Sequence, residues 1–266
     1  MVKRKGFAAE MALKISIITP TFNSSPFIID NMQSVRRQVY TDWEQIIVDG
    51  ASTDDTLAKI KTLSLAGTKL VSEPDEGIYD AMNKGIALAE GDVVGFLNSD
   101  DFYAHDQVLA RIASIMADPS VDACYADLDY VDKCDTQKVT RMWRSQPYHD
   151  GLFEKGWMPA HPTFYVRRDI LNRSGGFDLA FPRQADFELC MRLMAKYRIQ
   201  ARYYEDVWVK MRTGGASNNS LSGVLKGNLE AYQACRKNQL QINVMFIPIK
   251  IASRIPQFVA AFLNRQ

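Results

Sequence analysis

Short apolar segments alternate with helical patterns through roughly the first hundred residues of the chain. The apolar segments cover residues 14–19, 43–48, 69–72 and 93–97, and they are rich in β-branched side chains. Segments of this length and composition are typical of strands buried on both faces of a sheet. Strands that alternate with helices indicate βαβ units, so the sequence predicts an α/β fold with a mostly parallel sheet flanked by helices.

Each predicted strand is followed by a cluster of polar residues. Right-handed crossovers place the carboxyl ends of parallel strands along one edge of the sheet. We therefore expect the clusters to meet there and to line a pocket large enough for a nucleotide. The clusters are PTFNSSP at 20–26, DGASTDD at 49–55, EPDEG at 73–77 and NSDD at 98–101.

Apolar residues at helical spacing predict helices between these strands, each with one face toward the core. Ser52 or Thr53 is in position to cap the second of these helices. The residues expected on the buried faces are Ile29, Met32 and Val35, then Leu57, Ile60 and Leu63, then Ile78, Met82, Ile86 and Ala89.

Two adjacent carboxylates, Asp100 and Asp101, end the fourth apolar segment. Like charges side by side repel each other unless a cation or hydrogen bonds offset them. Because open α/β sheets bind ligands at this position, one interpretation is that these residues hold a divalent cation through oxygen. The other is a solvated turn, or the N-cap of a helix that begins near Val108.

The usual phosphate-binding loops are missing from the sequence. No GxxxxGK[ST] motif is present, and no GxGxxG motif follows the first predicted strand. A P-loop NTPase or a Rossmann dehydrogenase is therefore disfavoured. If a diphosphate binds at the predicted edge, a metal ion on Asp100 or Asp101 is the natural way to neutralise it.

Charge and cysteine content set further limits. The formal net charge of the 266 residues is +1, so we expect no nucleic-acid partner. The four cysteines form no CxxC pair and have no histidine at zinc spacing, which favours reduced thiols in a cytoplasmic protein. No signal peptide is recognisable at the N-terminus, and no uncharged apolar run reaches the roughly 18 residues that span a bilayer.

The second half of the chain is less regular, and we divide the whole sequence into three parts. Residues 1–13 are expected to be an extension, with Met11 a candidate for the natural start, and residues 14–217 the α/β domain. Residues 218–266 are expected to form a helical region. Within the domain we predict strands at 123–130, 139–143 and 203–211, a loop at 156–164, a turn at 175–178 and a helix from Gln184.

Residues 249–263 have the pattern of an amphipathic helix. A narrow polar stripe that includes Lys250, Arg254 and Gln257 runs along an otherwise apolar surface. A broad apolar face with a basic edge suits a helix that lies on an anionic membrane. The alternative is that this face packs on the α/β domain or on a second copy of the chain in a homodimer.

Several motifs taken together resemble family 2 glycosyltransferases of GT-A fold. In chain order they are TPTFN at 19–23, VDGASTDDT at 48–56, EPDEG at 73–77 with AMNKG at 81–85, and LNSDD at 97–101. The resemblance extends from about residue 14 to residue 217. The later HPT at 161–163 and DFE at 186–188 are similar to bacterial members that build capsule, exopolysaccharide or O-antigen, including transferases of the colanic-acid type.

This resemblance implies transfer of a sugar, with inversion, from a nucleotide sugar to a hydroxyl of a glycan or of a polyprenyl-diphosphate-linked acceptor. By resemblance, Asp49 would bind the base, most simply uracil, Asp100 the ribose or sugar, and Asp101 a Mg²⁺ or Mn²⁺ ion. Asp186 would be the general base. The remaining donor-binding residues would be Pro20, Thr21, Asn23, Ser52, Asp75, Gly77, Asn83, Lys84 and Arg212. Since the motif is Ser-Asp-Asp and not Asp-x-Asp, which carboxylate binds the metal stays open.

Simpler interpretations compete with these roles. Asp49 precedes a glycine and suits a turn, Asp186 suits a helix N-cap, and Arg212 suits an exposed surface. His161 is a candidate for the donor or acceptor site or a structural histidine. Trp157 and Phe164 could stack on a sugar, although core packing is the simpler expectation.

Two other functions remain to be weighed. One is a non-catalytic sugar-nucleotide-binding or scaffold subunit of an assembly complex on the inner face of the cell membrane. The other is a sugar-nucleotide pyrophosphorylase, which is disfavoured because no glycine-rich loop follows the first strand. A lipid-linked acceptor would explain peripheral attachment to the membrane.

Overall fold

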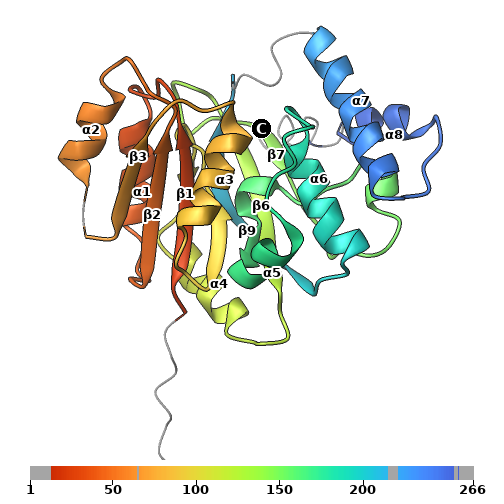
Figure 1. Cartoon of the computed structure of the whole chain (residues 1–266), viewed down its shortest axis with the longest axis horizontal. Helices are drawn as coiled ribbons and strands as arrows, with labels where there is room; N and C mark the ends of the chain where they lie inside the picture. Colours follow the sequence, from red (N-terminus) through yellow and green to blue (C-terminus); the bar gives the residue numbers. More distant parts are fainter. Residues whose placement is uncertain (1–12, 65, 215–220, 255–256, 258–266) are drawn as a thin grey trace, which may run out of the picture.

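The computed structural model describes residues 13–64, 66–214, 221–254 and 257 (Figure 1). The predicted N-terminal extension and Met11 lie almost wholly outside these residues. The predicted boundary between the α/β domain and the helical region also falls in a part that is not described, so this division stays a prediction.

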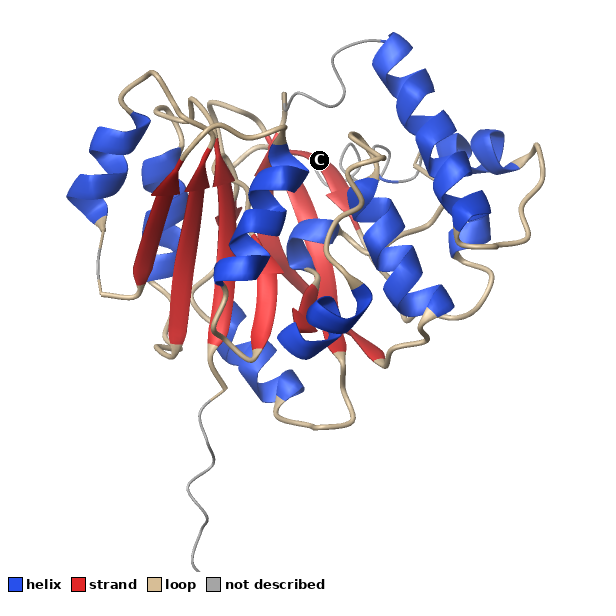
Figure 2. Cartoon of the chain, viewed as in Figure 1, coloured by secondary structure: helices blue, strands red, loops and turns tan. Residues whose placement is uncertain are grey.

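The first half of the chain forms the predicted βαβ units. Strands β1 (Ile15–Thr21), β2 (Trp43–Asp49), β3 (Thr68–Ser72) and β4 (Val93–Phe96) are parallel, in the order β3-β2-β1-β4. Their carboxyl ends lie along one edge, at the top of Figure 2. The connecting helices are α1 (Ile28–Arg36), α2 (Thr56–Leu63) and α3 (Ile78–Leu88).

The second half extends the same sheet, which has nine strands in the described part of the chain. Strand β6 (Ala123–Val131) runs parallel to β9 (Ala201–Arg212) and antiparallel to β7 (Val139–Trp143), close to the predicted bounds. Two strands were not predicted from the sequence: β5 (Phe102–Tyr103) and β8 (Tyr165–Arg167). Strand β8 joins the two halves by pairing antiparallel with both β4 and β6.

Helices cover both faces of the sheet, and the alternation of side chains along β1 explains how. Ile15 and Ile17 pack on the face covered by α1 and α4 (Val108–Met116), whereas Ile18 packs on the face covered by α3. Helices α5 (Arg168–Ser174) and α6 (Ala185–Met191) also pack on the α3 face (Figure 1). A short π-helical segment (Arg192–Lys196) continues α6.

Two predictions about the helices are wrong. Ile78 is 46% exposed, because it lies in the first turn of α3, beyond the part of the helix that packs on the sheet. Neither Ser52 nor Thr53 caps α2, whose N-cap residue is Asp55. Ser52 instead hydrogen-bonds with Asp49, as described below.

The C-terminal helices pack beside α6. Helix α7 (Leu221–Lys237) lies against α6, and α8 (Phe246–Ala252) lies against α7 and a 3-10 turn at Phe153–Lys155. Phe246 is buried between these elements, with its ring centroid 6.3 Å from that of Phe187.

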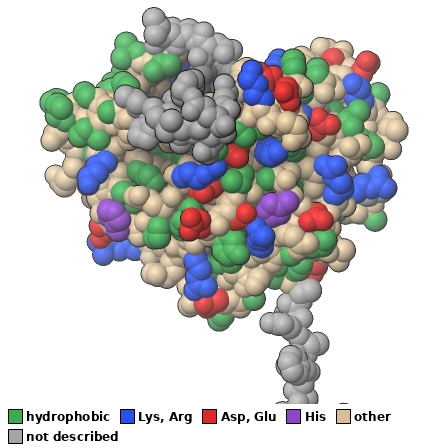
Figure 3. Space-filling model, turned by 180° about the vertical axis from the view of Figure 1, so that it is seen from behind, with side chains coloured by type: hydrophobic (Ala, Val, Ile, Leu, Met, Phe, Trp, Pro, Cys, Tyr) green, Lys and Arg blue, Asp and Glu red, His purple; other side chains and the backbone are tan. Residues whose placement is uncertain are grey.

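The orientation of α8 is opposite to the prediction at Lys250. Lys250 is 1% exposed and points into the protein, whereas Ile249 and Ile251 are 40% and 51% exposed. Apolar side chains therefore lie on the outer surface of this end of the molecule, as Figure 3 shows from behind. The rest of the predicted amphipathic segment lies largely outside the described residues. Within the described ranges, no helix is both long and apolar enough to cross a bilayer.

Candidate functional site

The loops that follow β1, β2 and β4 are joined by hydrogen bonds at the carboxyl edge of the sheet. The backbone N–H of Asn23 donates to Ser52 Oγ at 2.8 Å, and the N–H of Thr53 donates to Asn23 Oδ1 at 2.9 Å. Asn23 has a φ of 46°, a conformation that asparagine tolerates better than most residues. The hydroxyls of Ser24 and Ser99 lie 2.6 Å apart. The predicted convergence of the loops is confirmed.

Asp49 ends β2 as a fully buried carboxylate. It accepts hydrogen bonds from the Ser52 backbone N–H at 3.0 Å, from the Ser52 hydroxyl and from the Ser72 hydroxyl at 2.7 Å. Asp75 is half-buried and packs against Gly50, where a Cβ atom would lie 2.4 Å from Asp75 Oδ2. The backbone N–H of Gly77 holds Asp75 by donating to Oδ1 at 2.9 Å.

Asp100 and Asp101 have different environments although they are adjacent in sequence. Asp101 is fully buried, and its two oxygens accept hydrogen bonds from Asn98 Nδ2 at 3.0 Å and from the backbone N–H of Arg212 at 3.2 Å. Asp100 is only half-buried. Burial raises the pKa of both carboxyls, and the charge of Asp100 raises the pKa of Asp101 further. The alternative of a solvated turn is therefore wrong for Asp101, and the N-cap of α4 is Gln107.

Of the two acids, Asp100 is the better placed to contact a cation. Among the described residues no cluster of three or more histidine, cysteine or acidic side chains could hold a metal ion by itself. One accessible carboxylate is nevertheless compatible with Mg²⁺ or Mn²⁺, because such ions bind through one or two carboxylates and complete their shell with phosphate oxygens and water. The acid pair therefore fits a cation shared with a diphosphate.

Arg212 ends β9 beside this acid pair and is not a surface arginine, since it is 5% exposed. Its guanidinium donates to the backbone carbonyl of Asp100 at 2.7 Å and to the carboxylate of Asp30. The rings of Phe27 and Phe102 lie 5.1 and 4.8 Å from its Cζ. Arg212 Nε is buried and has no hydrogen-bond partner among the described residues, so within that part of the chain it is an unused donor next to Asp100.

Asp186 lies in the first turn of α6 and is half-buried. The N-cap residue of α6 is Gln184, so the N-cap interpretation of Asp186 is wrong. Asp186 Oδ1 accepts a hydrogen bond from the backbone N–H of Phe187 at 2.8 Å. Tyr79 of α3 also hydrogen-bonds with the Asp186 carboxylate; burial and this carboxylate raise the pKa of Tyr79 well above its usual value. Tyr79 is a site residue that the sequence reasoning missed, although it lies between two of the quoted motifs.

His161 is buried and lies within electrostatic reach of Asp186. It is 5% exposed and stacks on Phe96 of β4, with ring centroids 5.3 Å apart, while Phe177 contacts it edge-on at 5.5 Å. Burial lowers the pKa of His161, and the charge of Asp186 partly opposes this. In the part of the chain that the structure describes, His161 Nε2 has no hydrogen-bond partner. Its role at the donor or acceptor site stays a prediction.

The other predicted donor-binding residues differ in their availability. Pro20 and Thr21 are buried at the end of β1. Asn83 uses both ends of its amide to bind the backbone of Phe177, at 2.9 and 2.8 Å. Lys84 donates to the carbonyl of Pro74 and pairs with two acidic side chains. In this structure Asn83 and Lys84 therefore brace the loops at Phe177 and Pro74.

The two aromatic residues considered for sugar stacking, Trp157 and Phe164, differ in their exposure. Phe164 is 1% exposed and belongs to the core. Trp157 is half-buried, stacks on Tyr148 at 6.0 Å and lines a cavity described below.

Comparison with known proteins shows the family to which this fold and these loops belong. Residues 16–175 match the family model described as "Glycosyl transferase family 2", and the chain belongs to this family. A PGL/p-HBAD biosynthesis glycosyltransferase of Mycobacterium bovis is 31% identical over 212 residues, which cover 77% of this chain and 79% of that protein. The O-antigen biosynthesis protein RfbC of Myxococcus xanthus is 31% identical over 193 residues, 67% of this chain but 14% of that protein.

Solved structures share the fold. The mannosyltransferase PcManGT from Pyrobaculum calidifontis, in complex with GDP-Man and Mn²⁺, matches with a TM-score of 0.63 and 21% identity, over 94% of this chain and 74% of that one. Residues 1–349 of S. aureus TarS, in complex with UDP-GlcNAc, match with a TM-score of 0.61 and 18% identity, over 95% and 72%. The GT-A fold implied by the sequence motifs is confirmed.

Proposed function

We propose that the protein is a metal-dependent inverting glycosyltransferase that uses a UDP-sugar and acts in the synthesis of a bacterial surface polysaccharide. The observation that carries this proposal is the placement of two kinds of carboxylate. The Asp100–Asp101 pair lies at the carboxyl edge beside Arg212, whereas Asp186 lies on α6, across from Tyr79 of α3. A donor diphosphate beside the pair would have its sugar directed toward Asp186.

In this proposal each group does one task. Asp186, fixed by Tyr79 and by its own helix, accepts the proton of the acceptor hydroxyl as that oxygen attacks the anomeric carbon. The resemblance implied that Asp101 binds the metal, but Asp101 is fully buried and both its oxygens accept hydrogen bonds, so we assign Mg²⁺ or Mn²⁺ to Asp100 instead. The ion would supply Lewis-acid stabilisation of the departing diphosphate. Arg212, with its unused Nε donor, adds a fixed positive charge on the same side. Asp101 is the more enclosed acid, and we assign it to positioning Asn98 and Arg212.

The base of the donor and the class of acceptor are inferred from separate observations. Uracil over guanine rests on the buried Asp49 at the end of β2 and on the UDP-GlcNAc that TarS binds. A role in surface polysaccharide synthesis is supported by the similarity to the O-antigen biosynthesis protein RfbC. The apolar outer surface near α8 is compatible with peripheral attachment to a membrane on the cytoplasmic side. A homodimer remains a further expectation.

The test is donor hydrolysis and binding. A panel of UDP-, GDP- and dTDP-sugars is incubated with Mn²⁺, Mg²⁺ or EDTA, and diphosphate release is measured. We expect slow, metal-dependent release from one UDP-sugar, lost in Asp100→Asn and retained in Asp106→Asn, which removes an exposed carboxylate outside the site. If no donor is hydrolysed, calorimetry with UDP and Mn²⁺ decides, and failure to bind any nucleoside diphosphate would refute the proposal.

A further inference from the structure

A cavity lies between β7, the loop at 156–158 and the end of α8. Its volume is about 320 Å³. Trp143 and Trp157 give its wall aromatic character, and Arg144 and Arg254 give it charge. Aromatic faces next to arginine suit a ligand that has both an apolar or sugar part and an anionic part.

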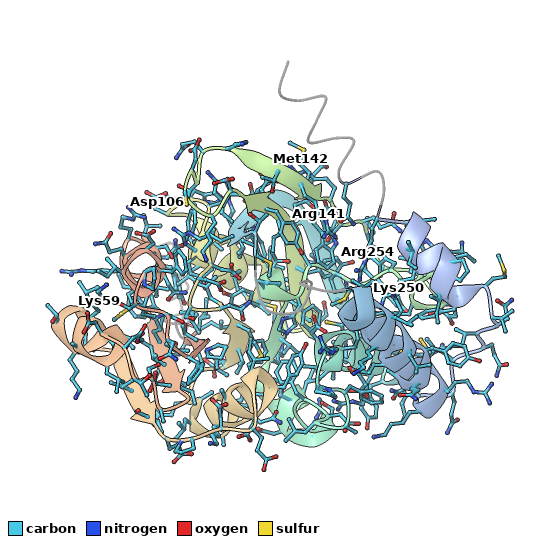
Figure 4. All side chains as sticks on the ribbon, turned by 90° about the horizontal axis from the view of Figure 1, so that it is seen from above. Lys59, Asp106, Arg141, Met142, Lys250 and Arg254 are labelled. Carbon is cyan, nitrogen blue, oxygen red and sulfur yellow. The ribbon has the colours of Figure 1, made fainter. Side chains whose placement is uncertain are left out.

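Three cations from distant parts of the chain lie at or near this cavity, and of these Arg254 lines it. Figure 4 shows Arg141 of β7, Arg254 and Lys250 of α8 in succession, with Arg254 between the other two. Burial and the charge of Arg254 lower the pKa of Lys250 to about 7. Burial also lowers the pKa of Arg141, and Arg254 contributes to this. The charge of Arg254 is thus close enough to repel both Lys250 and Arg141.

No carboxylate in the described part of the chain forms an ion pair with Lys250 or Arg254. Lys250 Nζ donates to the amide oxygen of Gln184 at 2.8 Å and lies 4.7 Å from the centre of the Phe187 ring, both neutral partners. Arg254, half-buried, forms no ion pair with any residue in the described ranges. Asp186 and Glu230 act on Lys250 only from beyond ion-pair distance. By contrast, Arg144 pairs with Asp129 at 2.7 Å.

Such an arrangement is costly unless an anion binds. The Lys250 ammonium is buried and has only neutral contacts, so it has lost hydration without gaining an ion pair. It is also repelled by the neighbouring guanidinium of Arg254. The position of Lys250 is nevertheless enforced, because its stem packs on Gly156, where a Cβ atom would lie 2.4 Å from Lys250 Cβ. Glycine is favoured at position 156 because of this close approach and because its φ of 77° lies in the left-handed region.

The cavity lies on the Asp186 side of the site. Gln184, which accepts from Lys250, is the N-cap residue of the helix that carries Asp186. Arg141 stacks on Tyr130, with its Cζ 4.5 Å from the ring centre. Tyr130 is in turn within electrostatic reach of Asp101, Asp186 and Arg254. A ligand in the cavity would therefore lie near the helix that carries Asp186.

We propose that this cavity binds a phosphate or diphosphate group of the acceptor, with Arg254 contacting the anion and Lys250 supplying positive charge behind it. Arginine recognises phosphate through a planar fork of donors, which suits this role. The proposal rests on the proposed function in one respect, that the anion belongs to the acceptor of a transfer reaction.

The experiment measures binding of farnesyl diphosphate, farnesol and inorganic pyrophosphate by calorimetry. The proteins are wild type, Arg254→Gln and the control Arg236→Gln, which removes the same charge from an exposed position on α7. We expect farnesyl diphosphate to bind wild type and Arg236→Gln equally, and Arg254→Gln at least about tenfold more weakly, as loss of a charge-assisted contact predicts. Binding of UDP with Mn²⁺ should be the same in all three proteins.

Three results would overturn the proposal: equal binding of farnesyl diphosphate by Arg254→Gln and wild type, farnesol binding as tightly as its diphosphate, or displacement of farnesyl diphosphate by UDP. Pyrophosphate binding that depends on Arg254, without binding of farnesyl diphosphate, would indicate a site for free phosphate and refute the acceptor role. Binding of farnesyl diphosphate does not require catalysis. Intact Arg254-dependent binding in a protein that binds no nucleotide would therefore refute the proposed function and leave the anion site standing.

Discussion

Replacing Lys250 with methionine should change how the stability of the protein depends on pH. Lys250 is almost fully buried on α8, and burial followed by the charge of Arg254 lowers its pKa from 10.5 to about 7. The unfolded chain keeps the higher value. Between these two pH values the unfolded chain therefore binds one more proton than the folded protein, and the stability of wild type rises with pH.

The magnitude follows from the two pKa values. Below about pH 7 both states carry the charge, and the full cost of burying it opposes folding. From about pH 7.5 to about pH 9.5 this cost falls by about 2–3 kcal/mol, close to the limiting slope of ~1.4 kcal/mol per pH unit. Lys250→Met lacks this contribution. The unfolding free energy of wild type minus that of Lys250→Met should rise by this amount.

Urea unfolding followed by circular dichroism at both pH values measures this difference, in a buffer free of phosphate so that no anion occupies the neighbouring cavity. Lys226→Met, at an exposed position of α7, controls for the loss of a positive charge. A difference between wild type and Lys250→Met that stays within about 0.5 kcal/mol over this range would refute the reasoning. It would mean that Lys250 is hydrated or ion-paired in the folded protein.

Asp186→Asn should bind UDP and metal as wild type does but transfer sugar at least about 100-fold more slowly, because the proton acceptor is lost; normal transfer rates would exclude Asp186 as the base. Gly50→Ala should lower stability by about 1–3 kcal/mol, since the new Cβ collides with Asp75. In an Asp75→Ser background the same change should cost clearly less in thermal unfolding, and an unchanged cost would contradict the collision. Arg212→Met should lower stability by about 1–3 kcal/mol, measured by unfolding, and weaken UDP binding, measured by calorimetry. Asp30→Asn changes the half-exposed ion-pair partner of Arg212 and should have the smaller effect in both assays.

The parallel half of the sheet could be predicted from sequence because each strand is long and apolar enough to be recognised. Residues 43–48 and 93–97 are examples, and both became strands with buried side chains. Strands β5 and β8 could not be predicted, since two and three residues are too few to show a period. Strand β8 is held in place by its pairing with β4 and β6, which sequence-local reasoning does not include.

The site was predictable to the level of which loops meet, but not to the level of individual side chains. Asp100 and Asp101 are chemically identical neighbours, and only Asn98 and the distant Arg212 decide which of them is enclosed. Helical periodicity placed Lys250 on a polar stripe, and polar stripes usually face water. Its inward orientation depends on Gln184 and Gly156, which belong to other segments, so no local pattern could indicate it.

The hydrogen bond from the Arg212 backbone to Asp101 spans 111 residues of sequence. During synthesis the acid pair therefore leaves the ribosome well before β9, roughly 5–20 s earlier at ordinary elongation rates. Until β9 is made and docks along β6, Asp101 lacks one of its two hydrogen-bond donors, the Arg212 backbone N–H, and is less enclosed. The edge proposed to bind metal and donor is thus completed late in folding, so a chain that stalls before β9 should have the parallel half of the sheet but no functional site.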